Sequence, residues 1–522
     1  MKQIRMKKAK TSSIEKNWFC IRCNAFVSED IGLKREGICP ECKRETHFFP
    51  RFFGDSKKKP DELLQKYEVS KKTYDKNTGE IVDIKINTSR LAELIFHEFN
   101  LNFLTTVDTN EIWFFNGSYY EPNGEFMIKY WVEQLLGEDT SEHFKRETVG
   151  YIRDKNPKKI DVFTPDLNLI NLKNGVYDIE TDNLNEHSPK YFFINQIPVI
   201  FKKDATCKKI KKFVSEVVYK DDIAVLQEFF GYCLYRRYNI HRAVMLLGEG
   251  KNGKSTLLNL LIRFLGNENV SGKELQSIID NRFGIASLYG KLANVAGDIP
   301  NKVLKRTGIF KSLTGEDLVN ADKKFKSDFD FVNYAKFIFS TNTLPVSDDK
   351  TYAFFRRWIL ISFPNTFDGE NCDKDIIVKI STEDELSGLF IWAIEGLKRL
   401  LKHGDFSYNK SVEEVMEQYK TLSDPIYAYV QSFLKCNIGD YVLKDELRKH
   451  YTKWCRKNKL TIIPKNMLTQ RLSEHLTEMR AGKAGGKGRQ KPAYINISWK
   501  EDVEKIDEEA TNLDTFSTGG DK

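Results

Sequence analysis

The segment Gly248-Glu-Gly-Lys-Asn-Gly-Lys-Ser-Thr256 fits the pattern G-x-x-x-x-G-K-[ST] from Gly248 to Ser255. It lies between an apolar run at residues 243–247, typical of a buried strand, and residues 255–265, which predict a helix that ends before a glycine. Glycines in such a loop let backbone N–H groups surround a phosphate at the helix N-terminus, where the helix dipole also favours negative charge. The combination of strand, loop and helix therefore predicts an ATP-binding loop.

Two side chains of this loop are suited to binding ATP and its metal ion. We expect Lys254 to contact the β- and γ-phosphates and the hydroxyl of Ser255 to bind Mg²⁺. The candidate nucleotide-contacting residues are Gly248, Glu249, Gly250, Lys251, Asn252, Gly253, Lys254, Ser255 and Thr256.

Two further strands are expected to bring polar groups to the same site. Residues 292–298 predict a strand that ends in Asp298, a carboxylate suited to the water shell of Mg²⁺. Residues 336–342 predict a strand that ends in Asn342, whose amide is suited to holding the attacking water. Because residues 240–365 alternate short apolar strands with helices, they predict an α/β domain built on a sheet.

A pair of arginines follows these strands. Phe355-Arg-Arg-Trp358 places two guanidinium groups before a further predicted strand at residues 359–363. An arginine delivered from a neighbouring subunit can stabilise transition-state charge, an effect worth roughly 10³–10⁵ in rate in well-studied GTPases. The candidate catalytic residues are therefore Lys254, Asp298, Asn342, Arg356 and Arg357.

Four cysteines are grouped near the N-terminus. Cys20-Ile-Arg-Cys23 and Cys39-Pro-Glu-Cys42 are separated by fifteen residues, which is the spacing of a tetrahedral thiolate zinc site. We expect Cys20, Cys23, Cys39 and Cys42 to bind one Zn²⁺ in a ribbon. Three roles stay open for this ribbon: docking DNA, docking a partner, or folding the N-terminus.

Residues 425–500 predict a small module with helices near 444–457 and 467–476 and a strand at 494–499. The loop before that strand, residues 480–491, has five basic residues, four glycines and no acid. This order suggests a winged helix whose wing lies along DNA phosphates, and a solvated loop is the alternative. Its candidate DNA-contacting residues are Lys483, Lys487 and Arg489.

Charge and hydropathy set limits on the class of protein. The formal net charge is +8, and residues 501–522 contribute −6 of it, so the preceding 500 residues carry +14. A basic body with an acidic tail is compatible with nucleic-acid binding. No apolar run approaches the roughly 18 residues that span a bilayer, and no secretion signal is present, so we expect a cytoplasmic protein without membrane contact.

Several motifs together resemble the superfamily-three helicases, especially the branch of phage and plasmid primase-helicases and the poxvirus primase-helicase. The residues that carry this resemblance are Lys311-Ser-Leu-Thr-Gly-Glu-Asp317, Ala321-Asp-Lys-Lys-Phe-Lys326, Thr341-Asn-Thr-Leu-Pro345 and Arg356-Arg-Trp358. Asn174-Gly-Val-Tyr-Asp178 and His187-Ser-Pro189 resemble the domain before the motor in that branch. The likeness extends over residues 110–500, about three-quarters of the chain.

The resemblance implies an AAA+ fold, a homo-hexameric ring, Mg-ATP hydrolysis and translocation 3′ to 5′ along one DNA strand. It assigns the finger to Arg356, with Arg357 in reserve, and the channel hairpin that grips DNA to Lys323 and Lys324. One departure is Ile299, which stands where many AAA+ enzymes place a glutamate that polarises water. The catalytic base is therefore unassigned: either Asp298 does both jobs, or another carboxylate acts, with Glu249 and Asp317 as candidates.

The resemblance and the residue patterns predict an ATP-dependent replicative helicase of a virus, plasmid or mobile element, which unwinds DNA at an origin. No paired-aspartate strand precedes residue 160, so a separate primase or polymerase is expected. The alternatives are a non-catalytic ATP-switched initiator and a DNA-packaging or transposition ATPase. The expected parts are a zinc ribbon (1–60), an α+β region (61–165), a helical collar (166–239), the motor (240–405), a winged helix (406–500) and an acidic disordered tail (501–522).

Overall fold

A computed structural model describes the chain at residues 18–20, 26–27, 36–38, 45–50, 60–75, 78, 81–98, 102–280, 282–300, 303–322, 328–369, 372–458, 462–485 and 490–500. The chain divides into two units. The first consists of Met1–Asp166 and His187–Ile194, and the second of Leu167–Glu186 and Asn195–Lys522.

A five-stranded parallel sheet forms the centre of the second unit, with the strand order β15-β16-β19-β14-β20. The strands are β14 (Ala243–Leu247), β15 (Val270–Ser271), β16 (Ala293–Ala296), β19 (Lys336–Thr341) and β20 (Trp358–Ser362). Every residue of β14, β16 and β19 is buried, as expected where helices cover both faces of a parallel sheet.

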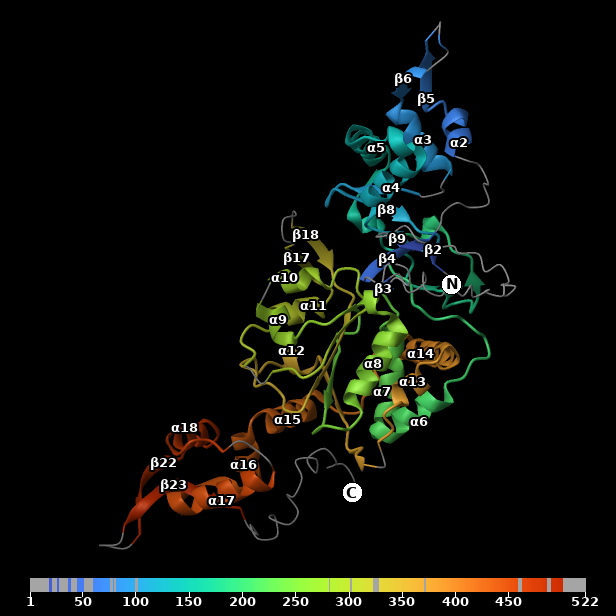
Figure 1. The fold of residues 1–522 in the computed structure, drawn as a ribbon. Helices are drawn as coiled ribbons and strands as arrows, with labels where there is room; N and C mark the ends of the chain where they lie inside the picture. The colour runs from blue at the N-terminus through green and yellow to red at the C-terminus, as the bar shows by residue number, and fades with distance from the viewer. Residues whose placement is uncertain are drawn as a thin grey trace, which may run out of the picture. The chain divides into compact units, whose positions relative to one another are not determined.

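Helices lie on both sides of this sheet. In Figure 1, α7, α8 and α14 lie on one side, and α9, α11 and α12 lie on the other. Within the described ranges, no helix combines the length and apolar composition needed to cross a membrane. The helices are α6 (Lys208–Val217), α7 (Asp222–Tyr232), α8 (Lys254–Leu265), α9 (Leu275–Asp280), α10 (Arg282–Ala286), α11 (Gly308–Leu313), α12 (Tyr352–Phe355), α13 (Ile376–Ile380), α14 (Glu383–His403) and α15 (Val412–Ser423).

Helices α7 and α14 approach each other closely because glycine faces the partner helix. A Cβ atom added at Gly231 of α7 would lie 2.2 Å from the carbonyl oxygen of Ala393. The contact also includes the carboxylate of Glu228, which is fully buried and accepts a bond of 2.7 Å from Nε of Arg399. The backbone N–H of Ser407 donates to the other oxygen of Glu228 at 2.8 Å, so each oxygen of the buried carboxylate accepts a hydrogen bond.

Three smaller sheets complete the second unit. Strands β11 (Leu169–Leu172), β12 (Gly175–Asp178) and β13 (Leu184–Asn185) form an antiparallel sheet before α6. Strands β17 (Leu318–Ala321) and β18 (Phe329–Val332) form a two-stranded hairpin after α11. The C-terminal module has an antiparallel sheet in the order β21-β23-β22. Its elements are α16 (Pro425–Phe433), β21 (Leu434–Leu443), α17 (Lys444–Lys457), α18 (Lys465–His475), β22 (Arg480–Ala484) and β23 (Lys491–Trp499).

The first unit combines helices with short strands and has its own apolar core. Leu91, Leu94, Met127 and Trp131, each at most 2% exposed, belong to that core. Its helices are α2 (Pro60–Lys66), α3 (Thr88–Glu98), α4 (Gly124–Leu136) and α5 (Glu142–Lys155). Its strands are β1 (Trp18–Cys20), β2 (Phe26–Val27), β3 (Glu36–Ile38), β4 (Glu45–Pro50), β5 (Ser70–Tyr74), β6 (Ile81–Ile86), β7 (Leu104–Thr106), β8 (Glu111–Phe115), β9 (Tyr120–Glu121) and β10 (Pro157–Lys158).

A lysine lies fully buried at the start of β19. The ammonium of Lys336 donates to the carbonyl oxygens of Tyr235 and Tyr334, each at 2.7 Å. It also lies 4.2 Å from the ring centroid of Tyr232. Burial lowers the pKa of Lys336 from 10.5 to about 7.

This depressed pKa predicts that stability rises with pH. Between pH 7 and 10.5 the unfolded chain holds a proton that the folded chain has lost, so raising the pH through this window favours the folded state. From pH 7 to pH 9, the wild-type chain should gain about 2 kcal/mol relative to Lys336→Met, in which this group cannot titrate. Thermal unfolding of both chains at the two pH values measures the difference. Parallel pH profiles for the two chains would contradict the prediction.

Candidate functional site

The loop between β14 and α8 has a backbone that requires glycine. Gly253, at the N-cap of α8, has a φ of +90°, and a Cβ atom there would lie 2.7 Å from Cγ1 of Val217. A Cβ atom at Gly248 would lie 2.0 Å from Nδ2 of Asn252. The loop is therefore compact, and it leads into the first turn of a helix, where backbone N–H groups have no partner within the helix.

Lys254 is the first residue of α8, and its side chain joins the loop to another strand. Only 5% exposed, it donates from Nζ to Oδ1 of Asn252 at 3.1 Å and to Oδ1 of Asn342 at 3.2 Å. It also donates to the carbonyl oxygen of Gly248. Burial lowers the pKa of Lys254, and the negative charge of Asp298 opposes this effect. The ammonium of Lys254 thus lies among neutral oxygens, and the carboxylate of Asp298 is near enough to raise its pKa.

Asp298 lies in a turn and not at the end of a strand. The strand expected at residues 292–298 is shorter, because β16 ends at Ala296. Asp298 has a φ of +49° and an exposed side chain. The N–H of the next residue, Ile299, donates to the carbonyl oxygen of Ser340 at 3.2 Å, which fixes this turn beside β19.

The carboxyl ends of the central strands thus supply a set of complementary polar groups. Asn342 directly follows β19 and contacts Lys254, while Ser255 lies exposed in the first turn of α8. Hydroxyl and carboxylate oxygens are ligands that Mg²⁺ accepts, and an ammonium beside a helix N-terminus suits a phosphate. The donor set of Ser255, Asp298 and Lys254 therefore fits a metal-bound nucleotide.

Glu249 and Asp317, the candidates for a catalytic base other than Asp298, lie in different places. Glu249 is exposed within the loop itself. Asp317 is exposed after α11, where its charge acts on Arg357 and His241. Asp317 is therefore associated with the arginine pair, whereas Glu249 belongs to the loop.

The two adjacent arginines after α12 have different surroundings. Arg356 is exposed, and its backbone carbonyl accepts a bond of 2.6 Å from Nη1 of Arg242. Arg357 is only 6% exposed, and its guanidinium donates to Oγ1 of Thr314 at 2.8 Å and to the carbonyl oxygen of Lys311 at 3.3 Å. Burial and the charge of Arg356 lower the pKa of Arg357. Of the pair, Arg356 is the one placed to contact another molecule.

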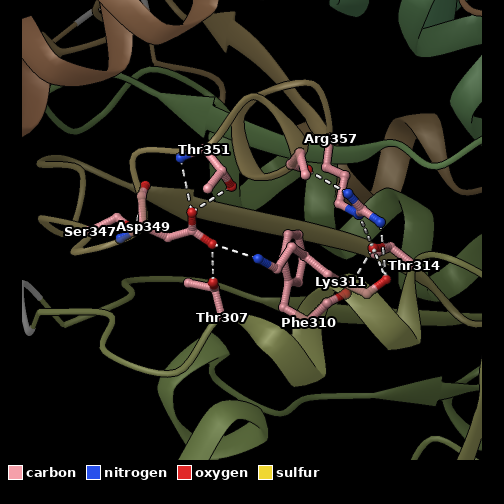
Figure 2. Close-up of polar contacts among 9 residues, drawn as sticks. Thr307, Phe310, Lys311, Thr314, Ser347, Asp349, Thr351 and Arg357 are labelled. Carbon is pink, nitrogen blue, oxygen red and sulfur yellow. Dashed lines mark hydrogen bonds and ion pairs between the residues drawn. The ribbon is translucent and has the colours of Figure 1, made fainter.

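An aspartate that the sequence patterns did not single out lies near this arginine pair. Asp349 accepts a bond of 2.8 Å from Nζ of Lys311, one of 2.9 Å from the N–H of Thr351, and one from the hydroxyl of Thr307. Although burial opposes its ionisation, these bonds hold the pKa of Asp349 well below its usual range. Figure 2 shows Asp349 in contact with Thr307 and Lys311, and Arg357 in contact with Lys311 and Thr314, at successive positions along α11 and its two ends.

This network fixes α11 to the segment that carries Arg356, since Asp349 and Arg357 flank α12 in sequence. The hairpin β17–β18 follows α11 in the chain. The only sequence signal for Asp349 is an acid within Ser347-Asp-Asp-Lys-Thr351, and such a run is equally typical of a solvated turn.

Several predicted site residues lie outside the described residues: Cys23, Cys39, Cys42, Lys323, Lys324, Lys487 and Arg489. Cys20 is the last residue of β1, and the structure describes its backbone only. Lys483 is exposed on β22. The zinc site and the two basic loops therefore stay predictions.

Three parts of the chain match known protein families. Residues 92–218 match a family described as D5 N terminal like, and residues 422–516 match one described as Poxvirus D5 protein-like. Residues 246–357, which include the glycine-rich loop and the arginine pair, match a family of unknown function, DUF5906. The two D5-like matches agree with the expected likeness to a poxvirus protein.

Comparison with curated proteins gives no match. Among solved structures, the A form apo structure of the NrS-1 C-terminal region aligns with a TM-score of 0.43 and 11% identity, over 79% of this chain and 100% of that chain. A further apo structure of the NrS-1 C-terminal region aligns with a TM-score of 0.40 and 12% identity, over the same shares of the two chains.

Proposed function

We propose that the chain is an ATP-driven DNA helicase of the superfamily-three type, with an AAA+ motor that works as a hexameric ring. It would move 3′ to 5′ along one strand and open DNA at a replication origin, with primers made by a separate primase or polymerase. The observation that carries the proposal is the 3.2 Å hydrogen bond from Nζ of Lys254 to Oδ1 of Asn342, because it joins the glycine-rich loop to a polar residue 88 positions later. The D5-like matches support a role in DNA replication.

In this proposal the phosphates of ATP bind the N–H groups of the loop and the ammonium of Lys254. A phosphate oxygen carries negative charge and is a stronger acceptor than the neutral oxygens that Lys254 contacts now. Ser255 and Asp298 would hold Mg²⁺, which neutralises charge on the β- and γ-phosphates. Asn342 orients the attacking water, and Arg356 of the partner subunit stabilises the charge that develops on the γ-phosphate.

This function is tested by measuring ATP hydrolysis and strand separation together. The purified protein should hydrolyse ATP faster when single-stranded DNA is present, and it should separate a fork with a 3′ tail only with hydrolysable ATP. Nucleotide-dependent binding of an origin without strand separation would instead identify an ATP-switched initiator, an alternative that Ile299 favours because no second acid follows Asp298. Translocation along duplex without separation would identify a packaging or transposition ATPase.

The N-terminal cysteines are proposed to hold one Zn²⁺ per chain. Structural zinc sites contribute apparent binding energies on the order of 10–16 kcal/mol in small peptides, so chelation should unfold the segment 1–60. The motor packs around its own parallel sheet and should keep its ATPase activity. Elemental analysis of protein purified without chelator checks this prediction, and iron, or less than one zinc per chain, would contradict it.

Two basic segments are proposed to hold DNA in different ways. If Lys323 and Lys324 grip the strand in the ring channel, replacing both with alanine should preserve ATP turnover but remove its stimulation by single-stranded DNA. If Lys483, Lys487 and Arg489 lie on a wing, neutralising them should weaken duplex binding. The slope of the logarithm of the binding constant against the logarithm of salt concentration should become shallower by about 0.9 per lost contact. Salt-dependent binding and ATPase assays distinguish the two, and an identical defect in both variants would contradict this division.

A further inference from the structure

A basic groove lies along α17 in the C-terminal module. Its volume is about 350 Å³, and the residues that line it are Arg448, Lys449, Thr452, Lys453 and Arg456. Side chains four residues apart on a helix share one face, so Lys449 and Lys453 lie together, and Arg448, Thr452 and Arg456 lie beside them. Both acids of α17 lie in its first turn, at the other end from Arg456.

The other side of α17 packs into the core of the module, and this packing turns the groove toward solvent. Leu447, Tyr451 and Trp454 are buried in the core of the module. Arg448 is held as well, because its Nη1 donates to the carbonyl oxygen of Ile463 at 2.6 Å. Lys449, Lys453 and Arg456 are exposed. The basic face is thus presented to solvent by the packing of the helix.

Charge compensation distinguishes α17 from α18, the helix that follows it. On α18, Arg471 pairs with Asp424 at 3.0 Å and with Glu474 at 2.6 Å. On α17, Lys449 and Arg456 form no ion pair with any residue that the structure describes. Two cations of α17, Lys449 and Arg456, therefore lack the acidic partner within the described residues that Arg471 of α18 has.

We propose that this groove binds the phosphate backbone of duplex DNA, as a second contact surface besides the basic segment 480–491, which comprises β22, the start of β23 and the residues between them. The proposal rests on the proposed action on DNA. From Arg448 to Arg456 the helix rises about 12 Å, at 1.5 Å per residue. Four cations over this length repel one another, and a polyanion relieves that repulsion. A duplex carries one charge per about 1.7 Å, twice the density of a single strand, so it is the better partner.

The test compares two full-length triple variants with the same change in charge. One is Lys449→Gln, Lys453→Gln, Arg456→Gln, and its matched control is Lys173→Gln, Lys374→Gln, Lys402→Gln, which replaces exposed lysines of the same unit. Fluorescence anisotropy with a short duplex is measured over a range of salt concentrations. The groove variant should bind more weakly, with a salt slope reduced by about 0.9 for each lost contact. The control should match the wild-type chain.

Charge-conserving replacement provides a second arm. Lys449→Arg with Lys453→Arg should keep the wild-type slope, because arginine also donates to phosphate oxygens. If the triple groove variant does not fold, Lys449→Gln alone, at an exposed position, should still lower the slope by about 0.9. An unchanged slope in the groove variant overturns the groove and leaves the proposed helicase intact. A wild-type chain that binds no DNA overturns the proposed function and the groove together.

Discussion

Replacing Lys254 with alanine is expected to abolish ATP hydrolysis, and strand separation with it, while the fold is kept. The side chain is the one buried ammonium within the described part of the loop, and its bonds go to Asn252, Asn342 and the carbonyl of Gly248. Loss of the Lys254 side chain removes the cation that faces the negative charge developing on the γ-phosphate. Removal of one such electrostatic contact lowers the rate roughly 10²–10³-fold in well-studied enzymes. Steady-state phosphate release measures this effect.

A matched variant shows that the loss is local. Lys374→Ala removes an exposed lysine of the same unit and should leave turnover unchanged. Thermal unfolding of Lys254→Ala should stay close to wild type, because the amides of Asn252 and Asn342 can bond to each other or to water. Undiminished turnover in Lys254→Ala would show that this loop does not bind the reacting phosphates.

Much of the central sheet could be predicted from local patterns. The apolar run at residues 243–247 coincides with β14, and the expected helix after the loop begins one residue early, at Lys254. The meeting of Lys254 with Asn342 also follows from the sequence, because neighbouring parallel strands end at the same edge of a sheet. Periodicity and loop chemistry are local properties, so they are readable without the fold.

Features that depend on distant partners could not be predicted. Nothing in Phe355-Arg-Arg-Trp358 indicates which guanidinium is buried, because two partners of Arg357, Thr314 and the carbonyl of Lys311, lie more than forty positions earlier. Lys336 is similar: a lysine that begins a strand is usually solvated, yet it is buried here between the carbonyl groups of Tyr235, 101 positions earlier, and Tyr334. The groove on α17 also requires knowledge of which acids pair with which cations.

Replacing Arg356 with alanine is expected to abolish turnover without loss of stability. Its side chain is exposed, and the hydrogen bonds that hold this residue are made by its backbone, whose carbonyl accepts from Arg242 and whose N–H donates to Tyr352. The finger supplied across a subunit boundary is worth roughly 10³–10⁵ in rate in well-studied GTPases. Arg357→Ala should instead lower the unfolding midpoint, because it removes the donor to the buried hydroxyl oxygen of Thr314 at a cost of about 1–3 kcal/mol. ATPase assays and thermal unfolding of the two variants separate these roles.

Mixing the two inactive variants tests whether Arg356 acts across subunits. In rings assembled from equal amounts of Arg356→Ala and Lys254→Ala, about a quarter of the head-to-tail interfaces pair an intact loop with an intact Arg356. Turnover should therefore be partly restored, although each variant alone is inactive. The matched mixture of Arg356→Ala with an Arg356→Ala, Lys254→Ala double variant contains no such interface and should stay inactive. If the first mixture also stays inactive while rings form, the exposed guanidinium does not act in trans, and the reason for its exposure must be sought elsewhere.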